Sequence, residues 1–208
     1  MIQAAHATAS TGADVLWPRR TGIPGLLRAA VLAVLGACLL TVSAKVSVPG
    51  PVPMTLQTLA VLMLGAALGP RIAIASVLVY LGEGAMGWPV FVNTPPLPAG
   101  PAYLVGPTAG FLAGFVVAAG IVGLAAARGL ARRPVLFLAA LAVADVAILA
   151  CGWAWLAYGL PLHGGLGMGA QKAFAVGIQP FLLGEAVKVA LAAALVPATV
   201  ALAERVRG

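Results

Sequence analysis

Long apolar runs alternate along the chain with short segments rich in proline, glycine or arginine. The runs are about Leu26–Ala44, Met54–Leu68, Ile72–Met86, Pro107–Ala127, Pro134–Tyr158 and Pro180–Ala203. The second and third are shorter than the roughly 20 residues that an untilted helical span needs, so we expect tilted or partly re-entrant helices there. The pattern predicts an all-α integral membrane protein with six transmembrane helices.

Two interruptions of the pattern carry structural information. Gly69-Pro70-Arg71 separates the second and third runs and predicts a tight turn at the inner surface. Gly87–Gly106 contains five prolines, which exclude a regular helix, yet Trp88, Phe91 and Tyr103 keep it apolar. A loop of this kind beside a membrane is typical of a lid or a binding loop. A plain interfacial anchor is the alternative.

Composition agrees with a membrane location. The 208 residues are 62% hydrophobic and 8% charged, with a mean hydropathy of +1.08, whereas soluble domains carry about a quarter charged residues. The net charge of +7 is not gathered into a basic face with aromatics, which argues against nucleic acid binding. Cys38 and Cys151 both fall inside apolar runs, so we expect no disulfide framework.

The polar N-terminus has a different character from the rest of the chain. Residues 1–25 lack the basic start and apolar stretch of a signal peptide and predict a short disordered cytoplasmic tail. Residues 26–208 predict a single six-helix membrane domain.

The arginines predict the orientation of the spans. With six spans, one side receives all of them, namely Arg19, Arg20, Arg28, Arg71, Arg128, Arg132, Arg133, Arg205 and Arg207. The other side receives Lys45 and Lys172. By the positive-inside rule both termini are then cytoplasmic, and the loops Lys45–Pro53, Gly87–Gly106 and Gly159–Gly177 face outward.

The sixth run contains an acid and a base in hydrocarbon surroundings. Glu185 and Lys188 are three residues apart and so lie on one face of a helix, in the outer half of the membrane. Buried charges are costly in a membrane, so the pair is a candidate functional site. The alternative is a neutral pair that only fixes helix packing. The amides of Gln57 and Asn93 add donors and acceptors for a small ligand.

Other classes of chemistry find little support. The chain has no GxSxG nucleophile motif and no GxxxxGK[ST] phosphate loop, which argues against an enzyme and against direct ATP binding. Its two histidines, His6 and His163, are too few for a histidine-rich metal site, so we expect no metal and no cofactor. Six short spans with so few polar positions do not predict a wet pore.

A strip of small residues marks the first run. Ala29, Ala33 and Ala37 recur every four residues and leave a smooth face that lets another helix approach closely. The abundance of alanine in the chain is the alternative explanation.

Four blocks of the sequence together resemble the BioY family, the biotin-specific substrate-binding subunits (S components) of energy-coupling factor (ECF) transporters. The blocks are Val52–Arg71, Gly87–Phe91, Ala102–Phe115 and Gly177–Ala193. The resemblance implies a six-helix bundle in the bacterial inner membrane that captures biotin from outside. It also implies ATP-driven uptake with a transmembrane coupling protein and ABC-type ATPases, some members being reported to work without the full module.

The resemblance also implies roles for particular residues. Lys188 matches the closing motif of the family, whereas Glu185 stands where the family usually has aspartate. Asn93 follows the block Gly87–Phe91, where the family places binding-loop residues, and Tyr103 in the block Ala102–Phe115 is expected to form a wall or a hydrogen-bonding partner. Gln57 falls in the TLQ motif, where helix packing is an alternative role. The alanine strip matches the surface that contacts the coupling protein.

Asp145 and the choice of ligand lie outside these matches. Asp145, near the middle of the fifth run, matches no binding motif of the family, and we expect it to satisfy a polar group within the bundle. The resemblance does not decide which end of biotin meets Glu185 or Lys188. An S component for another small vitamin, or an assembly scaffold without a ligand, remains the alternative function.

Overall fold

The computed structural model describes Trp17 and residues 21–48, 54–162 and 165–207 of the chain. Side chains are described within these ranges except at positions 48, 162 and 197–207. Most of the expected N-terminal tail, including His6, therefore lies outside the described residues, as does His163.

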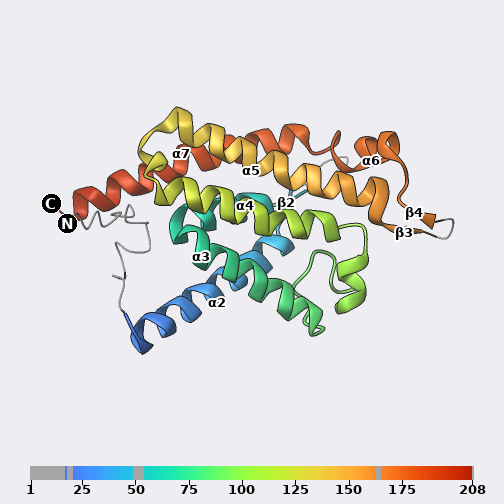
Figure 1. The fold of residues 1–208 in the computed structure, drawn as a ribbon, viewed down its shortest axis with the longest axis horizontal. Helices are drawn as coiled ribbons and strands as arrows, with labels where there is room; N and C mark the ends of the chain where they lie inside the picture. The colour runs from blue at the N-terminus through green and yellow to red at the C-terminus, as the bar shows by residue number, and fades with distance from the viewer. Residues whose placement is uncertain (1–16, 18–20, 49–53, 163–164, 208) are drawn as a thin grey trace, which may run out of the picture.

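Helices make up most of the described chain (Figure 1). The long ones are α2 (Ile23–Lys45), α3 (Gln57–Ala85), α4 (Ala109–Ala127), α5 (Pro134–Ala154) and α7 (Leu182–Arg207). The short ones are η1 (Pro101–Val105), η2 (Leu130–Arg132), the π-helical turn η3 (Trp155–Gly159) and α6 (Ala170–Gly177). Two antiparallel pairs of two-residue strands complete the fold, β1 (Ser47–Val48) with β2 (Met54–Thr55) and β3 (Pro161–Leu162) with β4 (Gly165–Leu166).

Four described helices are long and apolar enough to cross a membrane, namely α2, α3, α4 and α5 with its η3 extension. A fifth candidate results when α6 and α7, bent by 55° at their junction, are counted as one broken span. The chain is therefore a multi-pass membrane protein of the all-α class. The expected count of six spans and the orientation of the termini stay predictions.

The helix α3 is a folded hairpin rather than one straight rod. Gly69 interrupts it with φ 74° and ψ 174°, a conformation that glycine adopts without a steric penalty. The Gln57 side chain at its start hydrogen-bonds the Tyr80 hydroxyl at 2.8 Å. A straight helix would separate residues 23 apart by about 35 Å, so the two limbs run back along each other. This confirms the turn expected at Gly69-Pro70-Arg71.

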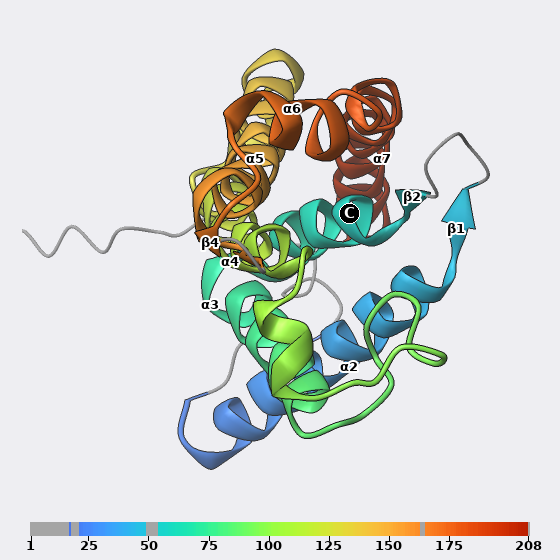
Figure 2. The same cartoon turned by 90° about the vertical axis from the view of Figure 1, so that its right-hand side faces the viewer.

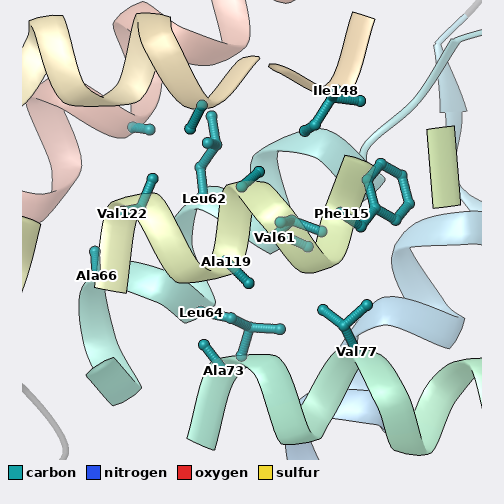
Figure 3. Close-up of a cluster of buried hydrophobic side chains, with 14 of the residues drawn as sticks. Val61, Leu62, Leu64, Ala66, Ala73, Val77, Phe115, Ala119, Val122 and Ile148 are labelled. Atoms are coloured by element: carbon teal, nitrogen blue, oxygen red, sulfur yellow. The ribbon is translucent and has the colours of Figure 1, made fainter. Parts of the chain in front are cut away.

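The core lies between the α3 hairpin and α4, with α5 on the far side (Figure 3). Small residues bring the backbones close together: a Cβ on Gly123 of α4 would lie 2.5 Å from Pro70 Cα at the turn. One large cluster of buried side chains spans the bundle and includes Val61, Leu62, Val77, Phe115, Ala119, Val122 and Ile148. This packing holds the α3 limbs and α4 as a rigid wall.

The segment Gly159–Gly177, expected to be an outward Gly-rich loop, has more regular structure than predicted. It contains the β3–β4 pair and the helix α6. Trp153 stabilises this arrangement because its indole N–H donates to the Ala170 carbonyl at 3.0 Å. The connections α3–α4 and α5–α6 gather at the same end of the bundle, on the right of Figure 1 and facing the viewer in Figure 2.

Candidate functional site

The acid–base pair of α7 forms as the spacing predicts. Lys188 Nζ lies 2.7 Å from Glu185 Oε1, and the two residues are only 5% and 6% exposed. At three residues apart on a helix, both side chains leave α7 on the same face. A short charge-assisted hydrogen bond of this kind offsets part of the cost of burying each group.

The first limb of α3 supplies polar groups that face this pair. The Thr58 hydroxyl donates to Glu185 Oε1 at 3.4 Å, a long hydrogen bond between side chains 127 residues apart in the sequence. The side-chain amide N–H of neighbouring Gln57 donates to the Tyr80 hydroxyl of the second limb. Gln57 thus joins the two limbs of the hairpin, the packing role that the sequence left as an alternative.

The loop between α3 and α4 is built around Phe91, which is fully buried. Its ring stacks on Tyr103 with centroids 4.4 Å apart and meets Tyr80 edge to face at 5.4 Å. The Tyr103 hydroxyl donates to the Val92 carbonyl at 3.0 Å. Because burial raises the pKa of the Tyr103 phenol, the group stays a neutral donor. These contacts fix the loop from Val90 to Tyr103 over the bundle.

Lys45, the last residue of α2, holds the same loop from the other side. Its ammonium donates to the Phe91 carbonyl at 2.6 Å, to the Thr94 carbonyl, and to Thr94 Oγ1 at 3.2 Å. The sequence presented Lys45 only as a marker of topology. In the structure it is the residue that ties α2 to the loop carrying Asn93.

These elements enclose a cavity of about 480 Å³, a size typical of small-molecule sites. All five candidate ligand-binding residues line it: Gln57, Asn93, Tyr103, Glu185 and Lys188. The other polar lining groups are Ser47, Thr55, Thr58, Tyr80 and Thr108, and the apolar ones include Phe111, Phe115 and Phe181. The structure therefore brings the candidates together, and their role in binding a ligand stays a prediction.

Asn93 has a backbone conformation that suits its place in the loop. Its φ is 57°, the left-handed region in which asparagine is among the better tolerated residues. A β-branched residue would be strained at this position. The bend at Asn93 lets its side chain line the cavity beside Val92 and Tyr103.

The alanine strip of α2 lies against the chain itself. Ala33 and Ala37 are 5% and 0% exposed, and α2 packs chiefly on α3. At neighbouring Gly36 an added Cβ would overlap the Ser76 side chain of α3. In this conformation α3 covers the faces of Ala33 and Ala37, while Ala29 is half-buried. The role of the three alanines in binding a partner stays a prediction.

Reasoning from the sequence left out one charged residue near the pair. Asp145 of α5 is 7% exposed, and its carboxyl contacts that of Glu185. The signal that finds it is simple, since an ionisable residue in the middle of an apolar span marks a functional position by default. The sequence carries no signal that singles out Thr58 or Tyr80, because hydroxyl groups are also common in helices that only pack.

The described cysteines and possible metal ligands were the other candidates for chemistry. Cys38 is exposed and Cys151 is half-buried, both as free thiols. Among the described residues no three His, Cys, Asp or Glu side chains come together as a metal site would require. The polar groups of the cavity suit hydrogen bonding to an organic ligand.

The chain resembles known proteins over nearly its whole length. The model of the BioY family matches residues 10–205. A probable biotin transporter BioY of Pyrococcus horikoshii is 36% identical over 178 residues, covering 85% of this chain and 94% of the relative. A biotin transporter BioY of Thermotoga maritima is 33% identical over 168 residues, covering 80% of this chain and 92% of the relative.

A solved structure has the same fold. The crystal structure of the S-component for biotin from an ECF-type ABC transporter matches with a TM-score of 0.67, covering 86% of this chain and 93% of that one. Its sequence is 18% identical to this chain, so the likeness concerns the fold.

Proposed function

This chain belongs to the BioY family, and from that membership we propose that it is the biotin-binding subunit of an ECF-type transporter. The observation that carries the proposal is the cavity of about 480 Å³ that ends on the buried Glu185–Lys188 pair. Its relatives are named as biotin transporters, and the solved structure that shares its fold is named as the S-component for biotin.

The cavity offers what a molecule with biotin's groups needs. Biotin combines an apolar ring system and chain with a ureido group and a carboxylate. Lys188 neutralises a carboxylate or donates to a carbonyl oxygen, and Glu185 accepts from N–H groups. Asn93 and Gln57 add amide groups, and the phenylalanines of α4 provide apolar walls. Either orientation of biotin satisfies this set.

In the proposed mechanism the outer loop closes over bound biotin. Lys45, Phe91 and Tyr103 hold the loop in the position that brings Asn93 to the cavity. Capture from outside requires this loop to open, because it covers one side of the site. No cofactor takes part, and partner ABC-type ATPases supply the hydrolysis of ATP for uptake through a coupling protein.

We place the protein in the bacterial inner membrane with six spans and cytoplasmic termini. The limbs of the α3 hairpin count as two short crossings, which with α2, α4, α5 and the α6–α7 unit gives six. The ends of α2, α4, α5 and α7 that carry or adjoin arginines, and the α3 turn with Arg71, share one end of the bundle (Figure 1). By the positive-inside rule that end is cytoplasmic, with the residues before α2 as a tail and residues 23–208 as one membrane domain.

A titration of the detergent-solubilised protein with biotin tests this function. We expect calorimetry to show one site per chain, and we expect biotin alone among a panel of vitamins to raise the melting temperature, since a ligand bound only by the native state stabilises it. Stabilisation by a different vitamin would show that this vitamin, and not biotin, is the substrate. A folded protein that no vitamin stabilises would favour a scaffold without a ligand.

A further inference from the structure

A third charged side chain, Asp145 of α5, lies next to the Glu185–Lys188 pair. Asp145 precedes the cavity residues Ile148 and Leu149 by three and four positions, so it lies on the same face of α5, one turn away from them. It is not among the residues that line the cavity, although it is as buried as the two α7 groups. Asp145 therefore lies behind the cavity wall and not in the cavity itself.

The carboxyls of Asp145 and Glu185 meet each other directly. They are within hydrogen-bonding contact. Asp145 Oδ1 and Glu185 Oε2 are both buried and have no hydrogen-bond partner among the described residues. Ionised carboxylates accept hydrogen bonds and cannot donate. Contact between two of them is favourable when one carries a proton and acts as the donor.

The charges around the two carboxyls also favour one shared proton. Lys188 is the buried cation of the cluster, so two ionised carboxylates would leave one net negative charge in an apolar interior. Facing groups on α3 are neutral, since Thr58 is a hydroxyl and Tyr80 pairs with Gln57. The helix α4 has no titratable residue. On the other elements that pack against α5, the charged or phenolic side chains are exposed, namely Arg132, Tyr158 and Lys172.

We propose that Asp145 is a positioning residue of the biotin site that shares one proton with Glu185, so that the three buried charges sum to zero before biotin binds. The inference rests on the proposed function for its ligand. One proton lies between the two carboxyls, and Lys188 balances the remaining negative charge. Glu185 thereby keeps the position in which it faces both Thr58 and the cavity.

A dependence of biotin affinity on pH follows from this arrangement. Biotin carries a carboxylate that is ionised above about pH 6. When the shared proton leaves, the cluster becomes negative and repels the anionic ligand. The binding form is the one that keeps the shared proton, so biotin affinity is highest at low pH and falls as pH rises and that proton is lost.

The first test compares the wild-type protein with Asp145→Asn. The asparagine keeps the shape and donates to Glu185, so the cluster with Lys188 is neutral without a shared proton. From about pH 6 to about pH 9 we expect biotin affinity to fall at least about fivefold for the wild type and less than about twofold for Asp145→Asn. The matched control Glu83→Gln, which changes a half-buried carboxyl of α3 outside the cavity, keeps the wild-type profile. Equal profiles for the wild type and Asp145→Asn would overturn the proposal.

The second test needs neither the asparagine variant nor the ligand. The chain has only five acidic residues, so the infrared band of a protonated carboxyl is readily assigned. We expect ligand-free wild type and Glu83→Gln to show this band at neutral pH and Glu185→Gln to lack it. Absence of the band from the wild type would refute proton sharing, whether or not the protein binds biotin. A band without biotin binding would instead refute the proposed function and keep the shared proton.

Discussion

The two ends of the cavity are built in different ways. At the inner end, Glu185, Lys188 and Thr58 are held by helices whose spacing fixes their direction. At the loop end, Asn93 lies on an irregular segment held by the hydrogen bonds of Lys45 and the ring contacts of Phe91, which join residues distant in sequence. The inner end therefore supplies charge chemistry, and the loop end supplies closure.

Because of this difference, we expect mutations at the two ends of the cavity to have different effects. A change at the inner end removes or unbalances a charge that the ligand needs, so it lowers affinity without altering the fold of the loop. A change at the loop end leaves the charges in place and loosens the cover, so it acts mainly on the rate of ligand release. Four substitutions test this contrast.

The largest effect is expected from Lys188→Ala. It leaves the Glu185 and Asp145 carboxyls buried without a cation, and breaking a buried ion pair costs about 3–5 kcal/mol. Biotin affinity should fall by at least about 100-fold in calorimetry. The matched control Lys172→Ala removes an exposed lysine of α6 and should bind as the wild type does. Wild-type affinity in Lys188→Ala would show that biotin binding does not depend on the buried charges at the inner end of the cavity.

The next effect is expected from Gly84→Ala at the end of α3. An added Cβ at this position would overlap the Phe91 ring, and overpacking of this kind costs about 1–3 kcal/mol. We expect the loop to detach, with a lower melting temperature and faster release of biotin. At Gly82, two residues earlier, a Cβ meets nothing within 4 Å, so Gly82→Ala is the control. Equal melting temperatures and biotin release rates for the two variants would show that packing of the Phe91 ring does not hold the loop.

A smaller effect is expected from Lys45→Met, which keeps the aliphatic stem and removes the ammonium. Its three hydrogen bonds to Phe91 and Thr94 are lost. The loss should weaken biotin binding by about 1 kcal/mol, roughly fivefold, through a faster dissociation rate. Stopped-flow release of a labelled biotin measures it against Lys172→Met. A change confined to the association rate would contradict a role in closure.

The smallest effect is expected from Tyr103→Phe. The ring keeps its stacking on Phe91, and only the hydrogen bond to the Val92 carbonyl is lost. A neutral hydrogen bond contributes about 0.5–1.5 kcal/mol. Because this one holds the loop and not the ligand, we expect the low end of that range, an affinity about two- to threefold weaker. Tyr158→Phe, whose side chain is 61% exposed, is the control for loss of a hydroxyl. A loss as large as that of Lys188→Ala would place direct ligand chemistry at the loop end.

The sequence predicted the inner end well because local rules determine it. Spacing of three residues on a helix places Glu185 and Lys188 together, and the cost of charge in hydrocarbon marks them as a site. The turn at Gly69 was predictable for a similar reason, since glycine followed by proline interrupts a helix. Asp145 was visible by the same rule of intramembrane charge, but its contact with Glu185 depends on how α5 packs against α7.

The loop end was less predictable because contacts distant in sequence decide it. Lys45 reaches Phe91 and Thr94 across 46 and 49 positions, and no spacing rule connects them. Helix α6 was missed because glycines flank a segment of only eight residues. The burial of Ala37 against α3 was also hidden, since a small-residue strip suits packing within a chain as well as between chains.

A structure of the protein with biotin bound tests the central claim most directly. We expect ligand density inside the cavity, with a polar atom of biotin within about 3.2 Å of Lys188 Nζ and the loop from Val90 to Tyr103 closed over it. Density for biotin elsewhere on the protein, with the Glu185–Lys188 pair intact and the cavity occupied by solvent alone, would contradict the account.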